Sequence, residues 1–167
     1  MTDAMDRTVR AEGAVAGERW ALYGGADVRS FGDLVAGGEL GTATPSAYDE
    51  RSADAKALVR ASSSTVLTLA YQHLRQSDVP RWDQVAQRGY LRYGFDPQER
   101  QLAYARSQTF LSHPWLRQLD ATLSLQRSVE GRFRQRRGEN LEIRERDEVE
   151  TLGLLVEARS EPRPGWR

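Results

Sequence analysis

Residues 96–137 read DPQERQLAYARSQTFLSHPWLRQLDATLSLQRSVEGRFRQRR and carry the strongest local signals in the chain. Asp96-Pro97-Gln98-Glu99 has the sequence of a capping box, in which an aspartate accepts the N3 amide and a glutamate reaches back. His113-Pro114 interrupts the pattern, because the residue before a proline disfavours helical geometry. The segment therefore predicts two capped helices in tandem, 96–111 and 115–136, followed by a basic end.

The second of these helices is expected to have two apolar faces. At 100° per residue, Leu119 and Leu123 fall on one face, whereas Leu125, Val129 and Phe133 fall on a nearly opposite one. Such a helix either bends or packs against different elements along its length, one of which could be another chain. The predicted partner interface comprises Leu125, Val129 and Phe133, together with Phe31 and Leu34 from an irregular arm.

Apolar spacing outside this segment predicts further helices at 3–23, 53–76, 80–90 and 141–158. For 141–158 two structures fit: a helix, which we favour, and a hairpin, because Leu152, Leu154 and Val156 alternate. The predicted fold is mainly α, a single domain over residues 1–167 built as an irregular bundle of five to six helices. Residues 160–167 are expected to be a tail.

Residues 24–51 are rich in glycine and hold only one short apolar turn, around Phe31 and Leu34. We expect an irregular arm there. About 20 residues without regular structure are unusual inside a compact domain. The arm is therefore either a surface loop or a segment that lies on a neighbouring subunit.

Composition restricts the chemistry. The chain has no cysteine, and its two histidines, His73 and His113, form no metal-binding spacing. No phosphate-binding loop or nucleophile motif appears, so we expect no cofactor, no metal and no enzymatic activity; a small enzyme that uses carboxylates and arginines stays open. No apolar run approaches the ~18 residues of a membrane-spanning helix, and the N-terminus has no signal-peptide pattern. These features predict a cytoplasmic, non-secreted protein with no membrane partner.

Charge is uneven along the chain, although it sums to zero. Residues 74–137 carry twelve arginines against six carboxylates, and both flanking segments are acidic. A basic cluster ends the middle segment and consists of Arg127, Arg132, Phe133, Arg134, Arg136 and Arg137. Arginines interleaved with an aromatic residue can bind nucleic acid, or they can pair with the acidic residues of 142–150.

These observations favour a non-enzymatic structural subunit of a larger protein assembly. It would bind other subunits, identical or different, through the 115–137 helix and the 24–51 arm. The alternative is a DNA- or RNA-binding accessory protein that uses the basic cluster.

Overall fold

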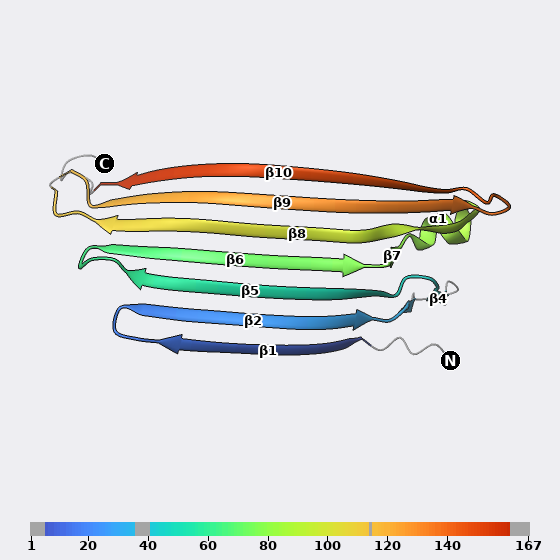
Figure 1. Ribbon diagram of the computed structural model, residues 1–167, viewed down its shortest axis with the longest axis horizontal. Coiled ribbons are helices and arrows are strands. Elements are labelled where there is room, and N and C mark those ends of the chain that lie inside the picture. Colours follow the sequence, from blue (N-terminus) through green and yellow to red (C-terminus); the bar gives the residue numbers. More distant parts are fainter. Residues whose placement is uncertain (1–5, 36–40, 114, 161–167) are drawn as a thin grey trace.

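The computed structural model describes residues 6–35, 41–113 and 115–160, and almost all of them lie in one antiparallel sheet. Figure 1 shows the long strands side by side in chain order. They are β1 (Arg7–Ala16), β2 (Trp20–Phe31), β5 (Tyr48–Arg60), β6 (Thr65–Ser77), β8 (Tyr90–Phe110), β9 (Gln118–Arg136) and β10 (Glu142–Arg159). Each strand pairs with the strands before and after it, so the sheet is a meander.

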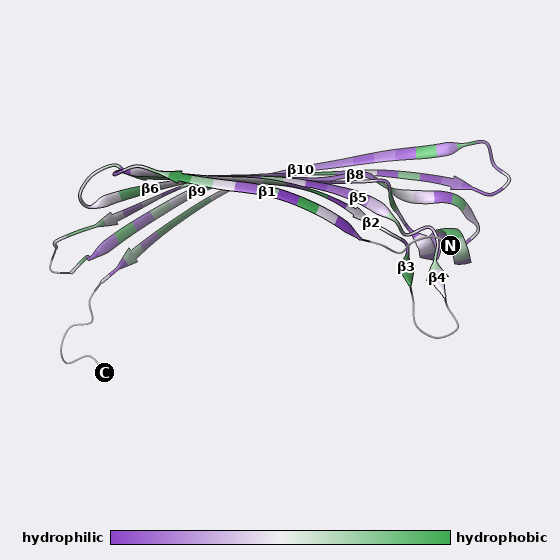
Figure 2. Ribbon diagram, turned by 90° about the horizontal axis from the view of Figure 1, so that it is seen from below, coloured by the Kyte–Doolittle hydropathy of each residue, from purple (hydrophilic) through white to green (hydrophobic). Residues whose placement is uncertain are grey.

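The connections differ at the two ends of the sheet. At one end, which we name the turn end, short connections at 17–19, 61–64 and 111–117 join the strands. The opposite loop end carries β7 (Val79–Pro80), which pairs with β8, and a small hairpin of β3 (Leu34–Val35) and β4 (Thr42–Ala43). The helix α1 (Trp82–Gln87) also lies there. Figure 2 shows a single arched layer, with the β3–β4 hairpin and α1 on the same side of it.

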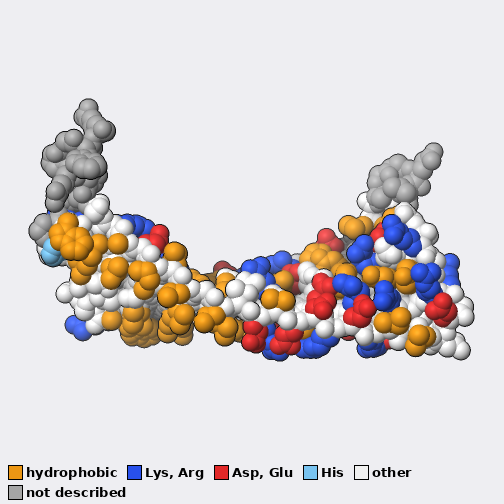
Figure 3. All heavy atoms as spheres, turned by 90° about the horizontal axis from the view of Figure 1, so that it is seen from above, with side chains coloured by type: hydrophobic (Ala, Val, Ile, Leu, Met, Phe, Trp, Pro, Cys, Tyr) orange, Lys and Arg blue, Asp and Glu red, His pale blue; other side chains and the backbone are white. Residues whose placement is uncertain are grey.

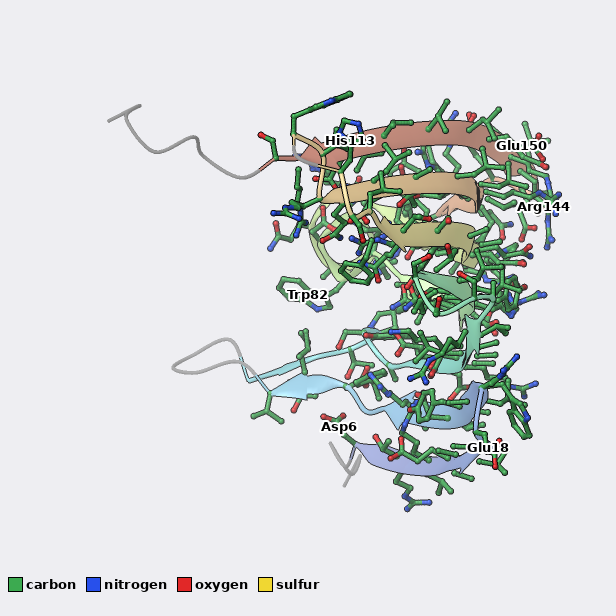
Figure 4. The ribbon with its side chains drawn as sticks, turned by 90° about the vertical axis from the view of Figure 1, so that its left-hand side faces the viewer. Asp6, Glu18, Trp82, His113, Arg144 and Glu150 are labelled. Carbon is green, nitrogen blue, oxygen red and sulfur yellow. The ribbon has the colours of Figure 1, made fainter. Side chains whose placement is uncertain are left out.

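Alternation along each strand gives the sheet two chemically different faces, because successive side chains point to opposite sides. Cross-strand partners share a face, so the register assigns every residue. The apolar face carries Leu22, Leu69, Leu123 and Leu154, and the polar face carries Asp27, Ser52, Arg106 and Asp120. In Figure 4, Arg144 and Glu150 of the apolar face lie on one side of the sheet, and Trp82 of α1 lies on the other.

Burial is inverted relative to a globular domain. Among the described residues, the buried hydrophobic side chains are Ala43 and Val129, whereas Asp27, Glu50, Thr68 and Asp120 are buried polar ones. Large apolar side chains lie in the open on most strands. Nothing within the described chain packs against the apolar face, so this sheet has no hydrophobic core of its own.

The predicted mainly α bundle is wrong. Of the predicted helices, only 80–90 contains helix, and α1 has six residues. In their described residues, the others, at 3–23, 53–76, 96–111, 115–136 and 141–158, are strands and turns. The physical reason is that alanine, leucine, glutamine and arginine have high helix propensity, and pairing with distant strands overrides it. No helix in the described part of the chain has the length and apolarity to cross a membrane.

Three local predictions are corrected in the same way. The proposed capping box at Asp96 is an irregularity in β8, where the register with β9 shifts between Phe95 and Gln98. The irregular arm at 24–51 begins in β2 and ends in β5, and its described middle holds β3 and β4, while residues 36–40 lie outside the description. The hairpin, which was the second structure considered for 141–158, is not observed either, because β10 is one strand that pairs with β9. The tail at 161–167 lies outside the described residues.

Candidate functional site

A band without charged side chains crosses the apolar face on all seven long strands. It occupies every second position of residues 9–15, 20–28, 53–59, 65–71, 101–109, 119–125 and 152–158. We name this surface the apolar band. On β9, Arg117 precedes it and Arg127 follows it, an interval of ten residues. The band is one continuous surface, because the cross-strand register brings its rows into line.

The large apolar side chains of the apolar band are solvent-exposed. Leu123 is 51% exposed, and its partner Leu154 is 75% exposed. Trp20 is exposed at the turn-end border of the band on β2, and Tyr71 is exposed at the last position of the band on β6. Figure 3 shows hydrophobic side chains gathered toward the turn end of the sheet and charged ones gathered toward the loop end. An exposed apolar surface of this extent marks a contact with a partner or a membrane.

The polar face opposite the apolar band carries ion pairs between neighbouring strands. Arg10 on β1 bonds to Asp27 Oδ2 at 3.1 Å and to Asp54 Oδ1 at 3.0 Å. Arg29 Nε lies 2.8 Å from Asp27 Oδ1, and the Ser52 hydroxyl also donates to this carboxylate. The bond from Ser52 and the nearby Arg29 and Arg10 hold the pKa of Asp27 below its usual range, against the opposing effect of burial. Asp27 is therefore a charged group that joins three strands.

A second polar cluster surrounds Asp120 near the turn end. Gln118 Nε2 donates to Asp120 Oδ1 at 2.8 Å, and Arg106 Nη2 donates to Oδ2 at 2.7 Å. Arg159 of β10 lies 3.9 Å from the same oxygen. The bond from Gln118, followed by the interaction with Arg106, lowers the pKa of Asp120. Both clusters lie at the level of the apolar band, so the polar face carries charged groups on the same strand segments where the apolar face carries none.

Two shallow hollows of about 460 and 510 Å³ lie over the middle of the sheet. They share Arg100, which donates to Gln126 Oε1 at 3.2 Å. Their linings mix polar groups, among them Gln72, Gln98 and Ser128, with the apolar residues Leu74 and Leu102. This mixed lining indicates no particular class of ligand.

The predicted basic cluster does not form a single surface. Arg127 and Phe133 lie on one face of β9, whereas Arg132, Arg134 and Arg136 lie on the opposite face. Arg127 pairs with Glu148 at 2.6 Å, and Arg134 pairs with Glu145 at 2.9 Å.

The rest of the cluster also contacts neighbouring groups. Arg132 reaches Glu130 at 3.1 Å, Arg136 stacks over Tyr90, and Arg137 donates to the Val85 carbonyl at 3.4 Å. Arg92 lies over the ring of Phe133. Of the basic cluster, Arg127 and Arg134 thus pair with acidic residues of 142–150.

The predicted partner residues are dispersed. Leu125 lies in the apolar band and is half exposed, whereas Val129 on the same face is buried. Phe133 lies farther toward the loop end. Phe31 stacks on Tyr48 with ring centroids 4.5 Å apart, and Leu34 is exposed on β3. Of this set, only Leu125 belongs to the apolar band.

Sequence reasoning missed most of the apolar band. The available signal was alternation, as in Leu152, Leu154 and Val156, and in Trp20, Leu22 and Val28. Within the described ranges, no group of three or more acidic or histidine side chains is arranged to hold a metal ion. The chain matches no known family model, no curated protein and no solved structure.

Proposed function

We propose that this sheet is a non-enzymatic structural element embedded in a membrane, with its apolar band against lipid acyl chains and its polar face toward water. The observation that carries the proposal is the band itself, which is charge-free on seven adjacent strands and whose large apolar side chains are exposed. The proposal replaces the expectation that no membrane takes part, which rested on the absence of a long apolar run.

The dimensions of the band support lipid as its partner. A tilted strand needs about nine to eleven residues to cross the hydrocarbon core of a bilayer. The charged positions Arg117 and Arg127 that bracket the band on β9 are ten residues apart. Aromatic residues concentrate where hydrocarbon meets headgroups, and Trp20 lies at the turn-end border of the band on β2.

The hydrogen bonding of the backbone also supports a position in lipid, and it requires additional strands beside the two edges of the sheet. Hydrocarbon cannot hydrogen-bond, so an unpaired amide there costs several kcal/mol. The five inner strands are paired on both sides, whereas β1 and β10 are each paired on one side within the described residues. The proposal therefore includes a further strand beside each edge, from another part of a longer chain or from another copy. The proposal therefore keeps the expectation that this chain is part of a larger protein assembly.

The polar face supports the proposal because its charges need water or partners. Arg10, Asp27 and Asp54 form one network, and Arg106 and Asp120 another. Such groups inside a membrane protein face the protein interior or a water-filled cavity. Binding of nucleic acid stays a prediction, and the carboxylate pairing of Arg127 and Arg134 gives it no support.

Insertion into lipid vesicles tests the proposal. The unfolded protein is diluted into phosphatidylcholine vesicles, which are washed with alkaline carbonate and floated on a density gradient. We expect the wild type to remain with the vesicles. Leu123→Arg should lower retention strongly, because an arginine on a lipid-facing strand costs about 2–4 kcal/mol at the bilayer midplane.

Ser124→Arg is the matched control, since it adds the same charge one residue away on the polar face. It should be retained like the wild type. Release of the wild type by the wash, or equal retention of the two variants, would contradict the proposal.

A further inference from the structure

Two arginines lie directly opposite each other on the apolar face. Arg51 of β5 and Arg75 of β6 are cross-strand partners. Like charges in this position destabilise a sheet. Both side chains are exposed, and neither forms an ion pair or a hydrogen bond with another described residue.

The nearest carboxylates on this face form no ion pair with Arg51 or Arg75. The bond from Gln101 lowers the pKa of Glu99, and the charge of Arg75 helps to lower it. Glu99 is in register with Arg75, but its carboxylate accepts from Gln101 Nε2 at 2.6 Å and lies 3.1 Å from His73 Nε2. Asp49 precedes Arg51 by two residues on the same face and forms no ion pair with either arginine. The two guanidinium groups therefore keep their donors free.

The position of the pair on the sheet indicates its ligand. Arg51 and Arg75 are the first permanently charged side chains beyond the apolar band on their strands, on the loop-end side. At this level a membrane presents its headgroups to an embedded sheet. Arg127 lies at the same border of the band on β9, but Glu148 neutralises it at 2.6 Å. Arg51 and Arg75 are thus a positive pair at headgroup depth that forms no ion pair with a described carboxylate.

We propose that Arg51 and Arg75 together bind the phosphate of an anionic lipid headgroup. The inference rests on the proposed function, because it assumes that the apolar band lies in lipid. Guanidinium groups present planar, forked donors that match phosphate oxygens. An anion between the two arginines also removes the repulsion that the register imposes.

Vesicle titrations with two lipid compositions test this site. The wild type, Arg51→Gln/Arg75→Gln and the control Arg60→Gln are each titrated with phosphatidylcholine vesicles and with vesicles that also contain phosphatidylglycerol. Arg60 is an exposed arginine of β5 on the polar face. We expect the wild type and Arg60→Gln to prefer the anionic vesicles, and the double variant to lose about fivefold of this preference for each arginine.

The outcomes separate the two proposals. Failure of the wild type to enter phosphatidylcholine vesicles refutes the membrane proposal and the site with it. Normal insertion with an unchanged anionic preference in the double variant refutes the site alone. Inorganic phosphate, titrated calorimetrically against the protein in neutral micelles, should not bind measurably. Binding that the double variant abolishes would overturn the lipid assignment in favour of a free anion.

Discussion

Leu123 of β9 and Leu154 of β10 are cross-strand partners, and both side chains are more than half exposed. The next pair along the same strands, Thr122 and Leu155, faces the polar side. A cross-strand pair of leucines normally lies in a hydrophobic core. Here nothing in the described chain covers the pair, and the proposed function assigns lipid as its cover.

We predict that a glycine is required at position 131 of β9, where this strand packs closely against the irregular part of β8. A Cβ at this position would clash with the Asp96 carbonyl oxygen, a backbone atom that cannot move aside freely. Gly131→Ala should therefore lower the free energy of unfolding by about 1–3 kcal/mol. Urea titration of the protein in micelles measures this change.

Gly13→Ala is the matched control, because no atom lies within 4 Å of a Cβ built there. It should change the free energy of unfolding by less than about 0.5 kcal/mol. Equal effects of the two substitutions would contradict the close approach between β9 and β8.

The buried carboxylates predict that stability falls in acid. The pKa of Asp27 is lowered first by the bond from Ser52, and that of Asp120 first by the bond from Gln118. A folded-state pKa below the unfolded value of about 3.9 stabilises the fold above that pH. The contribution is lost as the pH falls through the lower, folded-state value.

Urea titrations between pH 7 and pH 2 test this dependence. The wild type should lose stability below about pH 4, and Asp120→Asn should lose less over the same range. Asp147→Asn, which changes an exposed carboxylate, should follow the wild type. A wild-type profile that is flat in acid would contradict the proposed role of these two groups.

The sequence allowed only part of this architecture to be predicted, and β9 shows why. Leu119, Leu123, Leu125, Val129 and Phe133 are separated by two or four residues. A spacing of four suits one face of a helix, and spacings of two and four both suit one face of a strand. A helix would place these residues on two faces, which predicts contacts with two partners. In the sheet they all lie on one face.

Local features were more predictable than the fold. The helix α1 falls inside the segment 80–90 that was predicted to be helical. The alternation of Leu152, Leu154 and Val156 was visible, and the helical interpretation was preferred because Glu and Arg surround them. The candidate site depends on register between distant strands, such as Arg51 opposite Arg75. No local pattern contains that information.

Spin labelling along β9 tests the central claim most directly. The chain has no cysteine, so single cysteines at positions 118–126 can each carry a nitroxide without background. In vesicles, labels at odd positions should be relaxed mainly by oxygen, which concentrates in hydrocarbon, and labels at even positions mainly by a water-soluble nickel chelate. This two-residue alternation is the predicted result. Equal access of the nickel chelate to Leu123 and Ser124 would contradict the proposal that the apolar band faces lipid.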